Sequence, residues 1–345
     1  MNARPETVLV TGAGGFVGSA VVRALVDAMR QPVGRPAFPD GRPLAHVVAM
    51  VRPHGSTERL AELPDGPEWS ILRADLSDPD AAEVIATVRP RTVMHLALDS
   101  ACHEPQSDQQ RTAMVGRPLE LLFNTLRSVP GANLVTTGSV AVIRPGDALA
   151  EDAPKEPNPA YLHYARAKLL EEEIITQLGT ATAVRWTHLR LFYLFGRHEK
   201  PSRLLPYLCR TLARGEEAQL SSGTQRRDYT DVDDVASAYL RALGAPDRLG
   251  SRCYHVGSGQ GMTVREFAEA VATVVGRPDL LRFGARAAAE LEGATIVADV
   301  RRIREELAWS VPDPRARIRR AAEWYLQQVA NPPAPLGGCH AMREE

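Results

Sequence analysis

A glycine-rich turn between a short apolar strand and an amphipathic helix is the feature that most constrains the fold of this chain. The apolar run Val8–Val10 is followed at once by Thr11–Gly18, which has the spacing G-x-x-G-x-x-G. From residue 16 to residue 29 apolar side chains recur every three or four positions, and this period predicts a helix. A glycine loop that leaves a strand and opens a helix is the junction that binds dinucleotides in βαβ folds.

Each glycine of this junction has a physical task. Gly12 permits the tight turn, Gly15 lets the backbone approach a pyrophosphate, and Gly18 lets the helix pack closely on the strand. The free N–H groups and the positive dipole end at the helix start then bind the phosphates. We therefore predict cofactor contacts from Thr11, Gly12, Gly14, Gly15, Phe16, Val17 and Gly18.

The rest of the first 190 residues alternates short strand-like runs with helix-like stretches. Further strands are expected at 45–51, 70–72, 92–96 and 133–136. This βαβα alternation predicts an α/β fold of the Rossmann type, a doubly wound parallel sheet with helices on both faces. After residue 189 the alternation weakens, and 196–228 is expected to form loops and short helices. Helices are expected at 231–243, 263–275 (with a capping box) and 313–329, and a strand at 253–256.

We expect two domains. A dinucleotide-binding domain is predicted over 1–190 plus about 229–257, and a smaller C-terminal α/β substrate-binding domain over 191–228 and 258–330. The tail 331–345, rich in proline, glycine and charged residues, is predicted to be disordered.

Composition excludes several classes of protein. The 41 basic and 42 acidic side chains nearly cancel, which argues against a nucleic-acid partner. Apolar runs are too short for a membrane helix, and the first residues do not resemble a signal peptide. The four cysteines are far apart and the histidines have no ligand spacing, so we expect no metal site and a cytoplasmic location.

The residues after the second strand predict which nicotinamide cofactor is bound. An acidic residue there binds free ribose hydroxyls, whereas a cation favours the additional 2′-phosphate of NADP. This chain has Arg52 at that position and no acidic residue before Glu58. We therefore expect NADPH as the preferred cofactor, with NAD as a possible one.

A tyrosine and a lysine supply candidate acid–base chemistry. Tyr164 and Lys168 are four residues apart in a predicted helix, so both project from one helical face. An ammonium beside a phenol lowers the pKa of the phenol and suits it to proton transfer. The end of the preceding strand offers hydroxyl groups at Thr136, Thr137 and Ser139 that can orient a reacting oxygen.

Taken together, these motifs resemble the extended short-chain dehydrogenase/reductase family, in particular its nucleotide-sugar branch. The resemblance extends from the glycine turn to about Trp324, and it is specific for the family but much less so for the reaction. It implies cofactor contacts from Asp75, Leu76, Leu96, Ala97, Tyr164 and Lys168, and it selects Ser139 as the catalytic hydroxyl with Thr137 as the fallback. Arg227 is the residue that the resemblance assigns to the substrate diphosphate, a task suited to a guanidinium group. Further substrate contacts are expected from Thr137, Ser139, Tyr193 and Arg203.

The chain also departs from the family pattern. Ile143 and Arg144 replace a usual Tyr-Gly pair, Tyr193 replaces a frequent asparagine, and Met114 replaces another. The contacts that relatives make through the replaced Tyr-Gly pair and asparagines are therefore not assumed for this chain.

Three reactions share this scaffold: reduction of a keto sugar, epimerisation and 4,6-dehydration. Dehydration is disfavoured because Val140 and Ala141 stand where dehydratases carry an acid pair. Arg52 favours reduction, so we expect an NADPH-dependent ketoreductase of a nucleotide-activated deoxysugar, most like the NDP-4-keto-6-deoxyhexose 4-ketoreductases. An NAD-dependent epimerase is the alternative, and a catalytically silent dinucleotide sensor is an alternative of another class. By resemblance, the enzyme is expected to be a homodimer.

Overall fold

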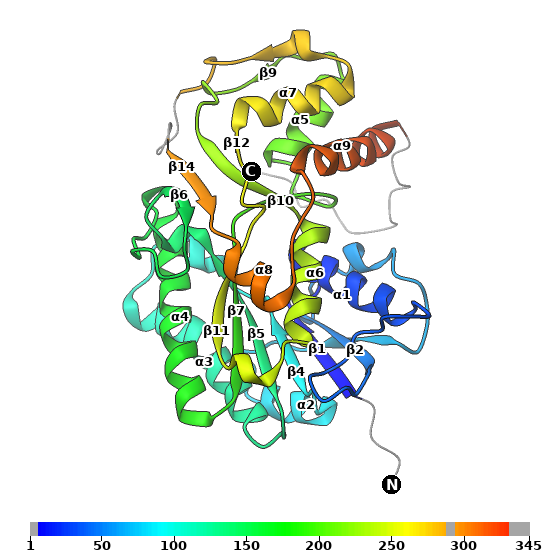
Figure 1. The fold of residues 1–345 in the computed structure, drawn as a ribbon, viewed down its shortest axis with the longest axis vertical. Helices are drawn as coiled ribbons and strands as arrows, with labels where there is room; N and C mark the ends of the chain where they lie inside the picture. The colour runs from blue at the N-terminus through cyan, green and yellow to red at the C-terminus, as the bar shows by residue number, and fades with distance from the viewer. Residues whose placement is uncertain (1–5, 288–293, 331–345) are drawn as a thin grey trace.

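The centre of the molecule is a seven-stranded sheet in which all neighbouring strands are parallel (Figure 1). The structure is a computed structural model and describes residues 6–287 and 294–330. From one edge to the other, the strands are β11 (Arg252–Val256), β7 (Arg185–Leu191), β5 (Asn133–Ser139), β4 (Thr92–His95), β1 (Glu6–Thr11), β2 (Leu44–Val51) and β3 (Trp69–Arg73). The direction of strand order reverses between β1 and β4, and such a switch point opens a crevice at the carboxyl ends of the strands. The predicted doubly wound parallel sheet is confirmed.

Helices cover both faces of this sheet. On one face lie α1 (Phe16–Met29) and α6 (Val232–Leu243), and on the other lie α2 (Ala81–Val88), α3 (Asp108–Leu126) and α4 (Leu162–Thr182) (Figure 1). Alternate residues of β1 point to opposite faces of the sheet. Val8 and Val10 pack in the apolar core between the sheet and α1 and α6, and Leu9 packs in the core between the sheet and α3 and α4. The apolar runs of the sequence therefore reflect strands that are buried on both sides.

Several predicted elements have the expected bounds. Helix α1 begins and ends at the predicted residues, and α7 (Val264–Val275) has the predicted capping box between Thr263 and Glu266. Strand β5 is longer than expected, because it continues three residues beyond Thr136 to Ser139. This extension places the hydroxyl groups of Thr137 and Ser139 at the carboxyl end of β5.

A smaller part of the molecule lies beyond the carboxyl ends of the sheet, in the upper half of Figure 1. It contains a sheet of five strands: β12 (Gly261–Thr263), β10 (Arg226–Asp231), β14 (Thr295–Ala298), β6 (Gly146–Leu149) and β8 (Tyr193–Phe195). A two-stranded sheet joins β9 (Ala218–Gln219) to β13 (Leu281–Arg282). Helices α5 (Leu204–Ala213), α7 and α9 (Pro314–Ala330) enclose an apolar core of their own.

The region 196–228 is more regular than the sequence predicted. It contains the ten-residue helix α5, strand β9 and the first residues of strand β10, rather than loops and short helices alone. Apolar residues of α5 such as Leu205, Leu208 and Leu212 are buried against α7 and α9, so distant partners stabilise this segment. After this segment the chain returns to the large sheet, where α6 packs on one face and β11 pairs with β7.

The predicted domain boundaries remain a prediction, and the tail 331–345 lies outside the described residues. In the described part of the chain, the remaining helices are α8 (Arg301–Leu307) and six short 3-10 helices: η1 (Glu58–Leu60), η2 (Ser100–His103), η3 (Val140–Val142), η4 (Pro159–Tyr161), η5 (Asp247–Leu249) and η6 (Pro278–Leu280). Over 6–287 and 294–330, no helix is both long and apolar enough to cross a membrane. Within the same ranges, no group of three or more His, Cys, Asp or Glu side chains is placed to hold a metal ion.

Candidate functional site

The glycine turn leaves the first turn of α1 open to an anion. Gly15 is the N-cap residue of α1 and makes no side-chain cap hydrogen bond, and the first turn of the helix carries no acidic side chain. Gly12 has a φ of +69°, and a Cβ there would lie 2.7 Å from the backbone nitrogen of Ala97. A Cβ on Gly14 would collide with the carbonyl oxygen of Ser56, and one on Gly18 with that of Gly12. The backbone therefore forms a cradle that side chains would fill, as phosphate binding requires.

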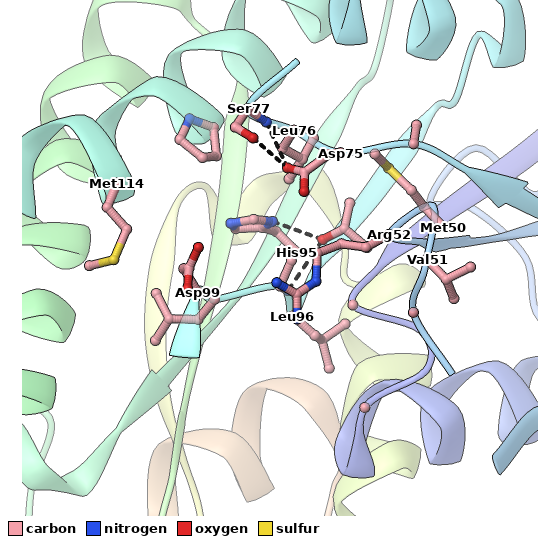
Figure 2. Close-up of a pocket in the computed structure, with 18 of the residues that line it drawn as sticks. Met50, Val51, Arg52, Asp75, Leu76, Ser77, His95, Leu96, Asp99 and Met114 are labelled. Carbon is pink, nitrogen blue, oxygen red and sulfur yellow. Dashed lines mark hydrogen bonds between the residues drawn. The ribbon is translucent and has the colours of Figure 1, made fainter. Parts of the chain in front are cut away.

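A cavity of about 570 Å³ opens beside this turn (Figure 2). It lies at the carboxyl ends of β1, β2 and β4, where the strand order reverses. Of the predicted cofactor residues, those that line the cavity are Thr11, Gly12, Gly14, Gly15, Arg52, Asp75, Leu76, Leu96 and Ala97. Phe16, Val17 and Gly18 lie behind the turn in α1 and are not among the lining residues. Tyr164 and Lys168 of α4 are not among them either.

Arg52 and Asp75 mark one end of the cavity. Asp75 accepts hydrogen bonds from the backbone nitrogen and the hydroxyl of Ser77, at 2.9 and 2.8 Å. The backbone bond from Ser77 holds the pKa of Asp75 below its usual value, and the nearby charge of Arg52 contributes to the same effect. Arg52 is exposed directly after β2, and the lining residues that precede it, Met50 and Val51, are apolar. The end of β2 therefore presents a cation, and no carboxylate, to the cavity.

The floor of the cavity is held by a buried pair of side chains. The hydroxyl of Thr11 lies 2.8 Å from Nδ1 of His95, and it also accepts a hydrogen bond from the backbone nitrogen of Ala97. Burial lowers the pKa of His95 to about 4, so the imidazole is neutral at physiological pH. This pair fixes the end of β4 against the glycine turn.

Helix α4 carries the candidate acid–base residues. The half-buried ring of Tyr164 stacks on the exposed imidazole of His103, with ring centroids 5.0 Å apart and planes 3° from parallel. Lys168 is buried, and its ammonium donates hydrogen bonds to the carbonyl oxygen of Thr137 at 2.7 Å and to Glu171 at 2.6 Å. No hydrogen bond between described residues joins this ammonium to the Tyr164 hydroxyl. The two residues share a helical face, but the direct charged partner of Lys168 is Glu171.

The end of β5 supplies two hydroxyl groups with different surroundings. The hydroxyl of Ser139 accepts a hydrogen bond from the backbone nitrogen of Ala141 at 3.2 Å, which leaves its own proton free for another acceptor. The hydroxyl of Thr137 donates to the carbonyl oxygen of His95 at 3.1 Å and lies 2.6 Å from the hydroxyl of Tyr239. Thr137 is thus tied to β4 and α6, and Ser139 keeps the freer donor.

The predicted substrate contacts come from the smaller part of the molecule. Tyr193 and Arg227 lie on the paired strands β8 and β10, and the guanidinium of Arg227 sits 5.1 Å from the centre of the Tyr193 ring. Arg227 is buried and donates a hydrogen bond to the carbonyl oxygen of its neighbour Arg226. Arg203 is the N-cap residue of α5, where it donates to Glu199 at 3.4 Å, and its charge, like that of Arg227, acts on the Tyr193 hydroxyl. The structure therefore groups Tyr193 with Arg227 and places Arg203 on another element.

Sequence reasoning missed two residues at this site, Glu171 and His103. Glu171 lines the cavity and is buried, although it is a carboxylate. A signal for it was present, because residues three apart on a helix lie on one face and Glu171 follows Lys168 by three. For His103 no local signal existed, since its contact with Tyr164 joins η2 to α4.

Comparison with known proteins gives a consistent family match. A model described as the NAD dependent epimerase/dehydratase family matches residues 8–257. The UDP-glucose 4-epimerase of Mycolicibacterium smegmatis is 27% identical over 314 residues, which cover 87% of this chain and 92% of that protein.

Solved structures extend the match to the fold. The UDP-glucose 4-epimerase of Thermotoga maritima, solved with UDP-glucose, superposes with a TM-score of 0.76 over 94% of this chain and 99% of that one, at 19% identity. The protein MoeE5, solved with UDP-glucuronic acid and NAD, superposes with a TM-score of 0.72 at 25% identity, over 93% of this chain and 99% of that one.

Proposed function

Because this chain belongs to the NAD dependent epimerase/dehydratase family, we propose that it is an enzyme that epimerises a nucleotide-activated sugar with a bound nicotinamide dinucleotide. The relatives named above support this proposal over nearly their whole length, and two of them are UDP-glucose 4-epimerases. We accordingly propose C4 of a UDP-hexose as the reacting centre. The motifs alone favoured reduction, and the relatives give greater weight to epimerisation.

One observation of the structure carries the proposal. A single cavity is lined both by the glycine turn, with its open helix N-terminus, and by Glu171, the partner of Lys168 on α4. Phosphate binding and the Tyr164–Lys168 helix are thereby brought to one place by elements more than 140 residues apart. Neither feature alone indicates nicotinamide chemistry, and their meeting at one cavity supports the proposal.

The residues present fit a dinucleotide. The cradle formed by Gly12, Gly14 and Gly15 would hold the pyrophosphate, and Asp75 would contact the adenosine end. Lys168, whose third N–H is left for a ligand, would hold the nicotinamide ribose. When bound, the nicotinamide supplies the capacity to accept a hydride from the sugar carbon and to return it.

The protein's own residues then handle the proton. Tyr164 accepts the proton of the sugar hydroxyl during oxidation and returns it during reduction. Ser139 donates a hydrogen bond to the reacting oxygen, and this bond strengthens as negative charge develops there. Arg227 binds the diphosphate of the sugar nucleotide and so anchors the substrate away from the reacting carbon.

Dehydration is not part of the proposal, because the residues after Ser139 do not favour it. The two residues after Ser139 are Val140 and Ala141, which are buried and have no acidic group. Elimination of water needs an acid and a base close to the sugar, and these positions supply neither.

A second candidate is NADPH-dependent reduction of a keto group on a nucleotide-activated deoxysugar. Arg52 is the observation that favours it, because the cation at the end of β2 suits a 2′-phosphate and because reductases use NADPH as a consumed reductant. The two candidates differ in stoichiometry: epimerisation consumes no cofactor, and reduction consumes one equivalent per product.

The test is a product assay with the purified protein. The protein is denatured to release its nucleotide, which is identified by mass spectrometry, and the native protein is incubated with UDP-glucose, UDP-N-acetylglucosamine and UDP-glucuronic acid. We expect one of these to be converted to its epimer with no net change in absorbance at 340 nm. Absence of any epimer, together with NADPH oxidation by a keto-sugar nucleotide, would instead establish the reductase.

The catalytic assignment is tested by Tyr164→Phe. Loss of the phenol proton is expected to lower turnover by at least about 100-fold, the usual scale for a positioned acid or base. The matched control is Tyr161→Phe, since Tyr161 directly precedes the same helix and this residue is 46% exposed. Near-normal turnover of the Tyr164 variant would exclude this residue as the acid–base group.

A further inference from the structure

The proposed function gives no role to the buried carboxylate of Glu171. Its side chain is 4% exposed, it reaches the cavity, and its oxygen lies 2.6 Å from the Lys168 ammonium, whose side chain is 6% exposed. Both groups are on α4, three residues apart, so the pair is formed within one helix, and Glu171 is the member of the pair that lines the cofactor cavity.

Burial of an ammonium is expensive unless it is paired. Desolvation pushes the pKa of Lys168 down, but the Glu171 carboxylate outweighs this effect, and the net result is a pKa above the ordinary value. Without its partner, a lysine this deeply buried releases its proton within the working range of pH.

The other groups that face the pair do not replace this carboxylate. From β4 comes neutral His95, and from η2 comes Cys102, whose thiol pKa is raised to about 11 by burial. Tyr239 of α6, which lies near Glu171, is kept in its phenol form by burial, and Tyr164 of α4 lies near the ammonium. Among the described residues, Glu171 is the carboxylate within ion-pair distance of Lys168.

We propose that Glu171 is a positioning residue, which keeps Lys168 charged and holds its ammonium against the carbonyl oxygen of Thr137. Two of the three ammonium donors are then fixed by β5 and α4, and the third remains for a bound cofactor. The inference rests on the proposed function, because it assigns the oriented ammonium to the cofactor ribose and to the charge balance around Tyr164.

The chain offers an unusually clean test of this charge. It contains three lysines, Lys155, Lys168 and Lys200. Protein labelled with ¹³C and ¹⁵N at lysine therefore gives three side-chain signals, which Lys155→Arg and Lys200→Arg assign. The titration is followed by NMR in the protein without added cofactor or substrate, for the wild type, Glu171→Gln and Glu171→Asp.

In the wild type, Lys168 is expected to remain charged at pH 9.5. In Glu171→Gln its pKa is expected to fall by at least about 2 units, as for other buried lysines without a partner. Glu171→Asp keeps the charge at a greater distance, so its Lys168 pKa is expected to lie between the two. The matched control is Glu173→Gln, which removes an exposed carboxylate of the same helix and is expected to leave the Lys168 titration unchanged.

Two results would overturn the proposal. One is a Lys168 that titrates in Glu171→Gln as in the wild type, and the other is an Asp variant that behaves like the Gln variant. If the Gln variant fails to fold, the Asp variant alone decides: an unchanged Lys168 pKa in it counts against the proposal.

Activity provides the second readout. The alkaline limb of the kcat profile is expected to move to lower pH in Glu171→Gln, in step with the Lys168 titration, and to remain in place in Glu173→Gln. A shifted lysine with an unmoved kcat profile would refute the positioning role and leave the ion pair as a structural feature. Failure of every sugar nucleotide to react would count against the proposed function, and the NMR titration would still decide the charge of Lys168.

Discussion

Glu199 is expected to make the stability of this protein fall as the pH rises. It lies in the loop between β8 and α5, its side chain is 6% exposed, and its buried Oε2 atom has no hydrogen-bond partner within 6–287 and 294–330. Burial raises the pKa of this carboxyl from 4.5 to about 7, although Arg203 partly opposes the shift. The loop around it is fixed to α9, because the backbone nitrogen of Glu199 donates to the hydroxyl of Tyr325 at 3.0 Å.

The direction of the effect follows from proton linkage. The folded state holds the Glu199 proton more tightly than the unfolded state does, so the stabilising contribution is fully present below pH 4.5 and is lost as the pH rises through 7. At 1.36 kcal/mol per pKa unit, the shift corresponds to about 3 kcal/mol, most of it lost between pH 5 and pH 8. Glu199→Gln keeps the shape of the side chain and removes the ionisation.

The assay is urea unfolding of the wild type and Glu199→Gln at pH 5 and at pH 8. The free energy of unfolding of the variant, relative to the wild type, is expected to rise by about 2–3 kcal/mol between the two pH values. Glu216→Gln, which changes an exposed carboxylate, serves as the control and is expected to show no such rise. An equal difference between variant and wild type at both pH values would refute the reasoning, because Glu199 would then ionise with an ordinary pKa in the folded protein.

Two further predictions concern the cofactor cavity. Gly14→Ala is expected to weaken dinucleotide binding at least about 10-fold in calorimetry, because the new Cβ collides with the carbonyl oxygen of Ser56 at the cavity rim. Gly34→Ala, whose Cβ meets nothing within 4 Å, should bind as the wild type does; equal loss in both variants would contradict this account. Arg52→Asp is expected to shift the ratio of NADPH to NADH affinity at least about 10-fold towards NADH. An unchanged ratio would show that Arg52 does not contact the cofactor.

The large sheet was predictable because its signals are local. The runs around Val8–Val10 and 45–51 are buried on both faces, and a strand of that kind is apolar throughout. In helix α1 apolar residues recur every three or four positions, and a capping box marks the first turn of α7. The region of α5 was not predictable in the same way, because its buried leucines are satisfied by α7 and α9, which lie far along the chain.

The same distinction between local signals and contacts of distant segments applies to the candidate site. Three features of the site could be predicted from the sequence: the glycine turn, Arg52 and the Tyr164–Lys168 spacing. Each depends on residues that are adjacent or one helical turn apart. The stacking of His103 on Tyr164 and the hydrogen bond between Thr137 and Tyr239 join segments from different elements. No window of sequence contains such pairs.

The sequence by itself determined the family, the parallel sheet and the phosphate-binding junction, since backbone geometry and apolar period are local properties of the chain. Tertiary structure decided which groups surround the reactive lysine. The ion-pair partner of this lysine is Glu171, and only the fold shows that its side chain is enclosed beside the ammonium. Desolvation depends on everything packed around a group, and this is the physical reason why charge at the site follows from the fold and not from spacing.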